Sequence, residues 1–318
     1  MSPRSQCRVP CSLTSAIRKA RPTVAFVLVL ACACAAAQEI EPRSYSNAPV
    51  GVNFLIAGYG YAAGGLSLDP ALPITDARLR TSSGLLAYAR TLDLWGKSAK
   101  FDVIAPYTSL SGSAQYLGQS VQRTVSGPND PRFRLSVNFY GAPALSMEEF
   151  RDYRQTLLAG ASLQVSAPWG QYDTNRVLNI GTHRWSFKPE IGASYALTPW
   201  SFELALGATF FTRNDEFYSG SVRTQQPLYA VQTHAIYNFA SGVWASLDLT
   251  YFTGGRSALD GVPSNDLQQN WRAGLTLALP INARHSLKLN ASRGVSARTG
   301  NNFDLLGLAW QYRWGGGV

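Results

Sequence analysis

The stretch Phe303-Asp-Leu-Leu-Gly-Leu-Ala-Trp-Gln-Tyr-Arg-Trp314 decides the fold, because its apolar and polar residues alternate one by one. Successive side chains of a β-strand point to opposite faces, so this alternation predicts a strand with one apolar and one polar face. The apolar face holds Leu306, Leu308, Trp310, Tyr312 and Trp314, and the other holds Gly307, Ala309, Gln311 and Arg313. The same pattern recurs along most of the chain, which therefore predicts an all-β protein.

Residues 1–37 have the layout of a secretory signal peptide. Five basic residues and no acidic residue precede an apolar run that extends from Val24 to Ala36. Ala35-Ala36-Ala37 then forms a small-residue cleavage site. The run is shorter than the roughly 20 residues of a membrane-spanning helix. We therefore expect export and cleavage before Gln38. A lipoprotein signal is the alternative, since Leu30-Ala31-Cys32 loosely matches a lipidation site.

Removing this leader changes the composition of the mature chain. All four cysteines lie within it, so the remaining chain can form neither a disulfide nor a thiolate metal site. The formal net charge falls from +9 to +4, because the leader holds five basic residues and no acid. The basic character of the whole chain is therefore largely a property of the leader, and nucleic acid is not an expected partner.

The composition of the mature chain favours strands over spanning helices. No apolar run approaches 18 residues, whereas the full chain has 28 glycines, 37 aromatic residues and only 15% charged residues. Two classes fit: a soluble β protein, or a closed barrel that crosses a lipid bilayer with no unpaired sheet edge.

Alternation predicts twelve strands, most of them longer than the strands of soluble proteins. Long and short connections between them alternate, as in an outer-membrane barrel with short periplasmic turns and long outer loops. The sequence therefore predicts a twelve-stranded, antiparallel, up-and-down transmembrane β-barrel over residues 52–318. The strands span residues 52–63, 78–90, 99–109, 132–142, 154–167, 184–197, 200–212, 228–239, 243–253, 269–279, 284–295 and 303–314.

Two segments fall outside this pattern. Residues 38–51 form a polar N-terminal segment that either plugs the lumen or lies in the periplasm. Leu145–Tyr153 predicts a short helix on a periplasmic connection, with Ser146 as its N-cap and Glu149 three residues later. The strands over 52–63 and 78–90 alternate poorly, unlike the others.

The predicted inward face carries ionisable side chains of both signs. One interpretation is a charged constriction that selects what passes, and the other is a set of mutually paired charges that fill a narrow lumen. The residues are Lys100, Asp102, Arg132, Arg134, Lys188, Glu190, Glu203, His234, Asp248, Arg272, Lys288 and Arg313.

Catalysis and metal binding have weak support in the sequence. The three histidines lie far apart and show no zinc-binding spacing, so neither a metal nor another cofactor is expected. His234 with Ser246 and Asp248 is a conceivable hydrolase site, but no Gly-x-Ser-x-Gly motif accompanies it. We expect no enzyme activity.

Six segments of the mature chain have a familiar sequence: Glu41–Gly51, Asp130–Arg134, Asn138–Ala144, Asn179–Gly181, Arg184–Gly192 and Asp266–Arg272. They resemble a bacterial family of transporters assigned to the phenol meta-cleavage (MetA) degradation pathway. The resemblance covers about Pro42 to Trp314, and it implies an outer-membrane barrel for uptake of aromatic or other hydrophobic compounds.

Together these observations predict a passive outer-membrane channel of a Gram-negative cell for small hydrophobic or aromatic compounds. A ligand would be caught by the loops 110–131, 168–183 and 254–268, and would pass the inward charges or leave sideways into the membrane. Among these charges, Arg132, Arg134, Lys188, Glu190 and Arg272 lie in the family-like segments. Expected partners are outer-membrane lipid, lipopolysaccharide, the ligand and the barrel-insertion machinery. A non-conducting structural barrel and an outer-membrane hydrolase are the alternatives.

Overall fold

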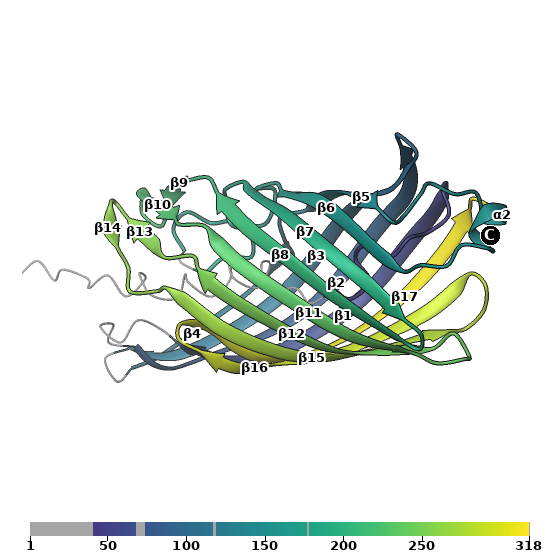
Figure 1. Cartoon of the computed structure of the whole chain (residues 1–318). Helices are drawn as coiled ribbons and strands as arrows, with labels where there is room; N and C mark the ends of the chain where they lie inside the picture. The colour runs from purple at the N-terminus through teal and green to yellow at the C-terminus, as the bar shows by residue number, and fades with distance from the viewer. Residues whose placement is uncertain (1–40, 68–73, 117–118, 177, 318) are drawn as a thin grey trace, which may run out of the picture.

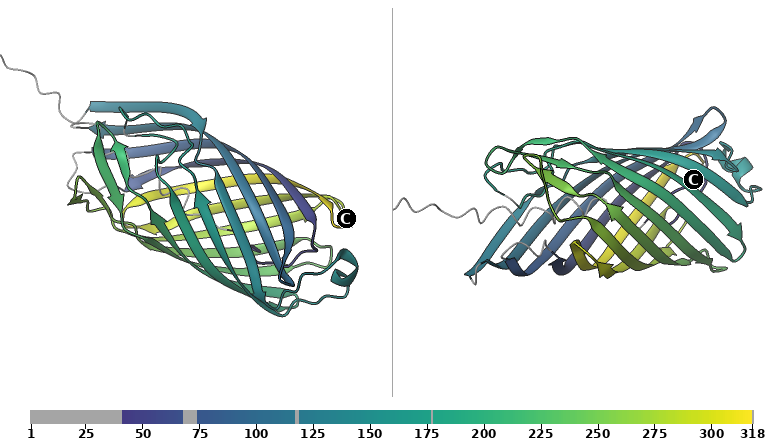
Figure 2. Two further views of the ribbon diagram at one scale, coloured as in Figure 1. Left: turned by 90° about the horizontal axis from the view of Figure 1, so that it is seen from above. Right: turned by 60° about the vertical axis from the view of Figure 1, so that its left-hand side comes forward.

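The computed structural model describes residues 41–67, 74–116, 119–176 and 178–317, so the predicted signal peptide lies outside the described residues. Its strands form a closed antiparallel barrel of twelve wall strands, in which β17 pairs with β1 (Figures 1 and 2). The predicted barrel and its strand number are confirmed. No helix in the described part of the chain is long and apolar enough to cross a membrane.

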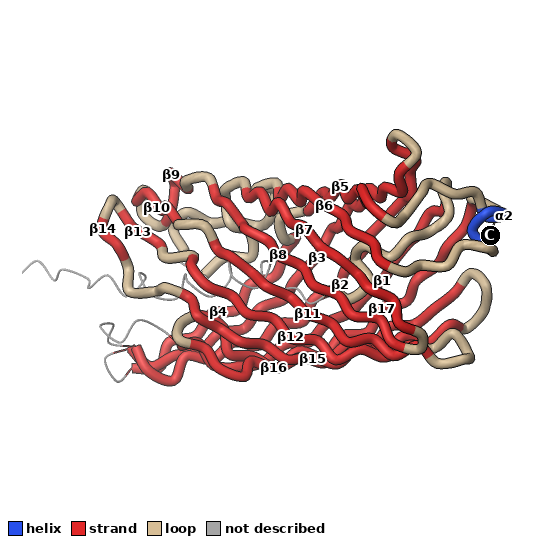
Figure 3. The backbone as a smooth tube through the Cα atoms, viewed as in Figure 1, coloured by secondary structure: helices blue, strands red, loops and turns tan. Residues whose placement is uncertain are grey.

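The wall strands follow the chain order, and β4 and β5 together make one of them. Figure 3 shows that strands form nearly the whole wall. Their bounds are β1 Val52–Ser67, β2 Ile74–Leu94, β3 Lys97–Tyr116, β4 Gln119–Pro128, β5 Arg132–Tyr140, β6 Leu157–Ser166, β7 Ser186–Leu197, β8 Trp200–Phe211, β11 Leu228–Asn238, β12 Trp244–Gly254, β15 Gln268–Pro280, β16 His285–Ala297 and β17 Gly300–Gly315.

One predicted loop is wrong. Residues 110–131 continue β3 to Tyr116 and then return as β4, which pairs with β3 from Tyr107 to Tyr116. The exposed face of β4 is polar, with Ser120, Gln122, Thr124 and Ser126, whereas Val121 and Val125 lie on its other face. It therefore lacks the outward apolar stripe by which the other strands are recognised. Among the described strands, β4 pairs with β3 alone. β5 follows β4 along the same wall strand, pairs with the earlier half of β3, and also pairs with β6.

The two ends of the barrel differ in the length of their connections, and we call them the turn end and the loop end. The turn end has the short connections 95–96, 198–199, 239–243 and 281–284, and Gly51 and Gly315 also lie there. It also carries helix α2, Met147–Phe150, whose capping box joins Ser146 and Glu149 as predicted. The loop end carries the long connections 167–185, 212–227 and 255–267. Two of these connections form a small second sheet of β9 Asn214–Phe217, β10 Ser221–Gln225, β13 Ser257–Leu259 and β14 Val262–Pro263.

The outer face of the wall is apolar and has aromatic clusters near both ends. Outward residues such as Leu204 and Leu206 are exposed, whereas inward neighbours such as Glu203 make hydrogen bonds inside. Tyr237 makes edge-to-face contacts with Trp200 and Phe239 at the turn end, and Tyr251 packs against Trp271 at a tilt at the loop end. An apolar band between two aromatic belts suits a bilayer between its two interfaces.

Candidate functional site

A cavity of about 810 Å³ lies inside the barrel. Its lining reaches from Pro280, beside a short turn, to Gly65 near the opposite end of β1. The inward residues of β17, β1 and β2 form one side of it, which we call the apolar wall. This wall comprises Phe54, Ile56, Leu85, Ala87, Phe303 and Leu305.

The apolar wall explains why β1 and β2 alternate poorly in the sequence. In β1 both faces are apolar, and in β2 the same holds around Leu86, which points outward and is 55% exposed while its neighbours Leu85 and Ala87 line the cavity. A strand whose lumen face is also apolar loses the period-two signal. The poor alternation around these residues therefore reflects an apolar stretch of the lumen face.

The N-terminal segment, residues 41–51, enters the lumen from the turn end. The backbone N–H of Val50 donates to Leu145 O at 2.8 Å, and that of Gly51 donates to Thr91 O at 3.1 Å. Further in, residues 41–48 contribute to the cavity lining. The segment thus narrows the lumen and does not form part of the wall.

Tyr45 is the buried aromatic side chain of this segment, with 6% of its surface exposed. Its ring lies against Gly192, where an added Cβ would come within 2.2 Å of a ring carbon. The hydroxyl group donates to Glu190 Oε1 at 3.1 Å, and Asn138 Nδ2 donates to the Tyr45 carbonyl at 2.9 Å. The wall therefore contains a recess for this residue, made by leaving out a side chain.

Arg43 forms a second attachment of the N-terminal segment. Its backbone N–H donates to Glu203 Oε2 at 2.8 Å, and its guanidinium donates to Asn238 Oδ1. The same guanidinium lies 4.6 Å from the ring centre of Trp244. Glu203 therefore holds the backbone of the segment in place.

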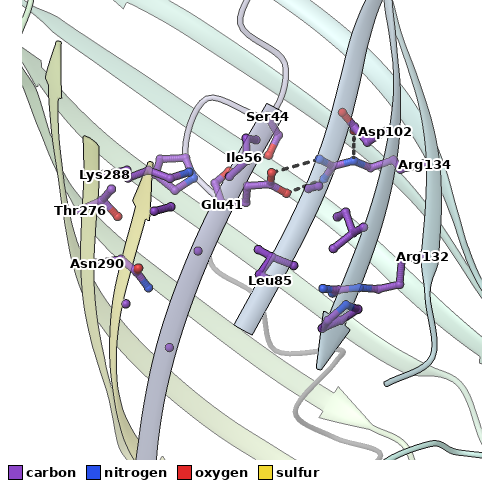
Figure 4. A pocket seen from close by; sticks show the side chains of 18 of the residues that line it. Glu41, Ser44, Ile56, Leu85, Asp102, Arg132, Arg134, Thr276, Lys288 and Asn290 are labelled. Carbon is purple, nitrogen blue, oxygen red and sulfur yellow. Dashed lines mark hydrogen bonds and ion pairs between the residues drawn. The ribbon is translucent and has the colours of Figure 1, made fainter. Parts of the chain in front are cut away.

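Glu41 forms the third attachment (Figure 4). Its carboxylate accepts hydrogen bonds from Nη1 and Nη2 of Arg134, and the Nε of Arg134 donates to Asp102 at 2.7 Å. Burial alone would raise the pKa of the Glu41 carboxyl, but the Arg134 guanidinium outweighs it and holds that pKa well below its usual value. The pair is therefore ionised at neutral pH.

The predicted inward charges occupy different positions in the structure. Eight of them line the cavity: Lys100, Asp102, Arg132, Arg134, Lys188, Asp248, Arg272 and Lys288. Glu190 and Glu203 hold the N-terminal segment, and His234 is buried against Asp248. Arg313 is not among the residues that line the cavity, and its Nε donates to Ala283 O in a turn at the barrel end. Its place in the solute pathway stays a prediction.

Both interpretations of the inward charges apply in part. Lys188 pairs with Glu190 at 2.8 Å, and His234 Nδ1 lies 2.7 Å from Asp248 Oδ1. Arg272 stacks over Phe303 at 4.0 Å and donates to Ser292 at 2.8 Å. These contacts stabilise the lumen, yet the cavity beside them stays lined by charged groups.

The conceivable hydrolase residues do not form a triad. Asp248 bonds to His234 and accepts from Thr276 Oγ1 at 2.9 Å. The Ser246 hydroxyl is buried and has no hydrogen-bond partner in the part of the chain that the structure describes, so it does not bond to His234. Nucleophilic catalysis needs that Ser–His hydrogen bond.

Asp130 attaches the connection 167–185 to the barrel wall at the loop end. Its carboxylate accepts from the backbone N–H of Gly170 at 2.9 Å and from the N–H and hydroxyl of Thr182, at 2.8 and 2.6 Å. These bonds hold the connection 167–185 beside the edge of β4 that no described strand pairs with. The Gln171 N–H donates to Pro128 O there.

Sequence reasoning gave no role to Asp130, Tyr45, Arg43 or Glu41. All four lie in segments that carry the family resemblance, which was the one signal available for them. These partners lie between 40 and 195 positions away along the chain, so no local pattern connects them.

Comparisons with known proteins agree with this architecture. A family model described as "Putative MetA-pathway of phenol degradation" matches residues 60–312. The COG4313 outer membrane channel from Pseudomonas putida F1 is similar in structure, with a TM-score of 0.74 and 20% identity; the match covers 87% of this chain and 100% of that one.

The transport unit of the autotransporter AIDA-I from Escherichia coli is similar at a TM-score of 0.52 and 10% identity, and the match covers 87% of this chain and 93% of that one. At these identities the likeness shows the fold. Comparison with curated protein sequences gives no match.

Proposed function

Because the chain belongs to the family described as "Putative MetA-pathway of phenol degradation", we propose that it is a passive outer-membrane channel for small hydrophobic or aromatic compounds. The apolar wall is the observation that carries this proposal. A channel for ions or sugars has no use for a lumen face of Phe54, Ile56, Leu85 and Ala87, whereas an aromatic ring gains free energy by leaving water against it.

We also propose that the barrel lies in the outer membrane with a defined orientation. The turn end, with both chain ends of the barrel and the short connections, lies in the periplasm, and the loop end faces outward. The chain reaches the outer membrane through a cleaved signal peptide and the insertion machinery, and its outward face contacts lipid and lipopolysaccharide. Its role is transport and not catalysis.

The route of the solute begins at the loop end. The connections 167–185 and 255–267 receive it, and it then moves along the apolar wall past the N-terminal segment. Sideways release is the second route, favoured by the edge of β4 that no described strand pairs with. A non-conducting structural barrel is the competing role, and it predicts no passage by either route.

A matched leucine pair tests the proposal. Leu85→Ala removes apolar surface from the cavity, and Leu86→Ala removes the same atoms from the outward face. We expect Leu85→Ala to weaken block of the ion current by toluene about tenfold, from the loss of roughly two or three buried carbons. Leu86→Ala should leave the block unchanged. Equal block in both variants would place the aromatic site outside this lumen.

A further inference from the structure

We propose that Arg134 is the receptor for the carboxylate of an aromatic acid, and that Glu41 occupies this receptor until a ligand displaces it. The proposal rests on the proposed function and names a substrate class for it. It also gives the N-terminal segment a regulatory role, because ligand binding and release of Glu41 become one event.

The contact between Glu41 and Arg134 has the form of a ligand in a binding site. Two guanidinium nitrogens donate to the two carboxylate oxygens, which is the forked geometry by which arginine recognises a free carboxylate. Asp102 holds the third guanidinium nitrogen, so Arg134 is oriented by the wall itself. The receptor would therefore keep its geometry without Glu41.

The two partners differ in how firmly they are held. The side chains of Arg134 and Asp102 are 10% and 6% exposed, whereas that of Glu41 is 36% exposed. Arg134 projects from β5 of the wall, and Glu41 belongs to a segment outside the barrel sheet. A fixed receptor with a more exposed occupant on a separate segment is an arrangement that competition can reverse.

The charge of the cavity favours an anionic competitor. Seven cationic side chains line it among the described residues, against four carboxylates, one of which is that of Glu41. Lys100 and Lys288 both act electrostatically on Glu41, and Figure 4 shows Lys288 beside it. When Glu41 leaves, this positive field remains and is available to a second carboxylate.

The apolar wall supplies the rest of the recognition. Ile56 and Leu85 line the same cavity as Glu41 and Arg134 (Figure 4), so the ring of a carboxylate bound at Arg134 would have apolar side chains of that cavity available to it. An apolar surface with one convergent cationic group is the usual form of a site for an amphipathic small molecule. Benzoate has both an apolar ring and a carboxylate, whereas toluene has only the apolar ring.

Calorimetric titration of the folded, detergent-solubilised protein with benzoate tests the proposal. Glu41→Ala removes the internal competitor and should tighten benzoate binding about tenfold, if the receptor is free in one molecule in ten or fewer of the unaltered protein. Glu148→Ala is the matched control, since it removes the same charge from α2, outside the lumen. Unchanged affinity in Glu41→Ala would overturn the proposal.

Arg134→Gln should abolish benzoate binding. Because this change leaves Asp102 without its partner, Asp102→Asn/Arg134→Gln serves as the second variant, with heat-modifiable migration as the check of folding. Benzoate binding that persists in a folded double variant would also overturn the proposal. Toluene block should be retained in every one of these variants, so loss of toluene block alone would count against the proposed function and not against the receptor.

Discussion

Gly192→Ala should raise the single-channel conductance about threefold or more, because it expels the N-terminal segment from the lumen. The added Cβ would lie 2.2 Å from one carbon of the Tyr45 ring and within 3.0 Å of two others. All three nearest atoms belong to Tyr45, so the strand itself has room for the methyl group. The collision is relieved by moving residues 41–48, which leaves a wider passage.

Three further variants isolate this effect. Gly60→Ala adds the same methyl group to the lumen face of β1, where the nearest atom is the carbonyl oxygen of Leu306, 3.9 Å away, and should not alter the conductance. Tyr45→Ala should raise it, and adding Gly192→Ala to Tyr45→Ala should have no further effect. An increase in Gly60→Ala as large as that in Gly192→Ala would show that the Tyr45 recess is not the cause.

Asp248→Ala should lower the free energy of unfolding by about 3 kcal/mol, the scale for breaking a buried pair by removing one partner. Asp248 is 1% exposed and bonds to both His234 and Thr276. Its loss leaves two buried polar groups, on His234 and Thr276, without this hydrogen-bond partner inside the barrel. The midpoint of urea unfolding of the folded barrel measures the change.

The control for Asp248 is an exposed carboxylate with an equally short ion pair. Asp304 lies 2.7 Å from Arg293, but both side chains are more than half exposed. Asp304→Ala should shift the unfolding midpoint little, since water replaces the lost partner. Equal shifts in the two variants would mean that the buried network contributes nothing beyond a surface pair.

The barrel could be predicted from the sequence because each wall strand must present one face to lipid. That requirement imposes a period of two on segments such as β8 and β15, and their outward residues are exposed as expected. Where the requirement is absent the prediction is poor. The exposed face of β4 is polar, and β9, β10, β13 and β14 form a sheet at the loop end, where no apolar stripe is needed.

The site was less predictable than the fold. The sequence placed Arg134, Glu190 and Glu203 on the lumen face, but their partners Glu41, Tyr45 and Arg43 lie on a segment without periodicity. Gly192 forms the recess by lacking a side chain, so it gives no positive signal. The weak alternation of β1 and β2 was informative, since it reflects the apolar wall.

Single-channel conductance of the refolded protein in planar bilayers, with and without toluene, distinguishes an open aromatic channel from a closed barrel. We expect a small steady conductance through the narrowed lumen, reduced by toluene that binds the apolar wall. A heat-modifiable, folded barrel that never conducts would contradict the open lumen. A steady conductance that toluene leaves unchanged would contradict an aromatic site within it.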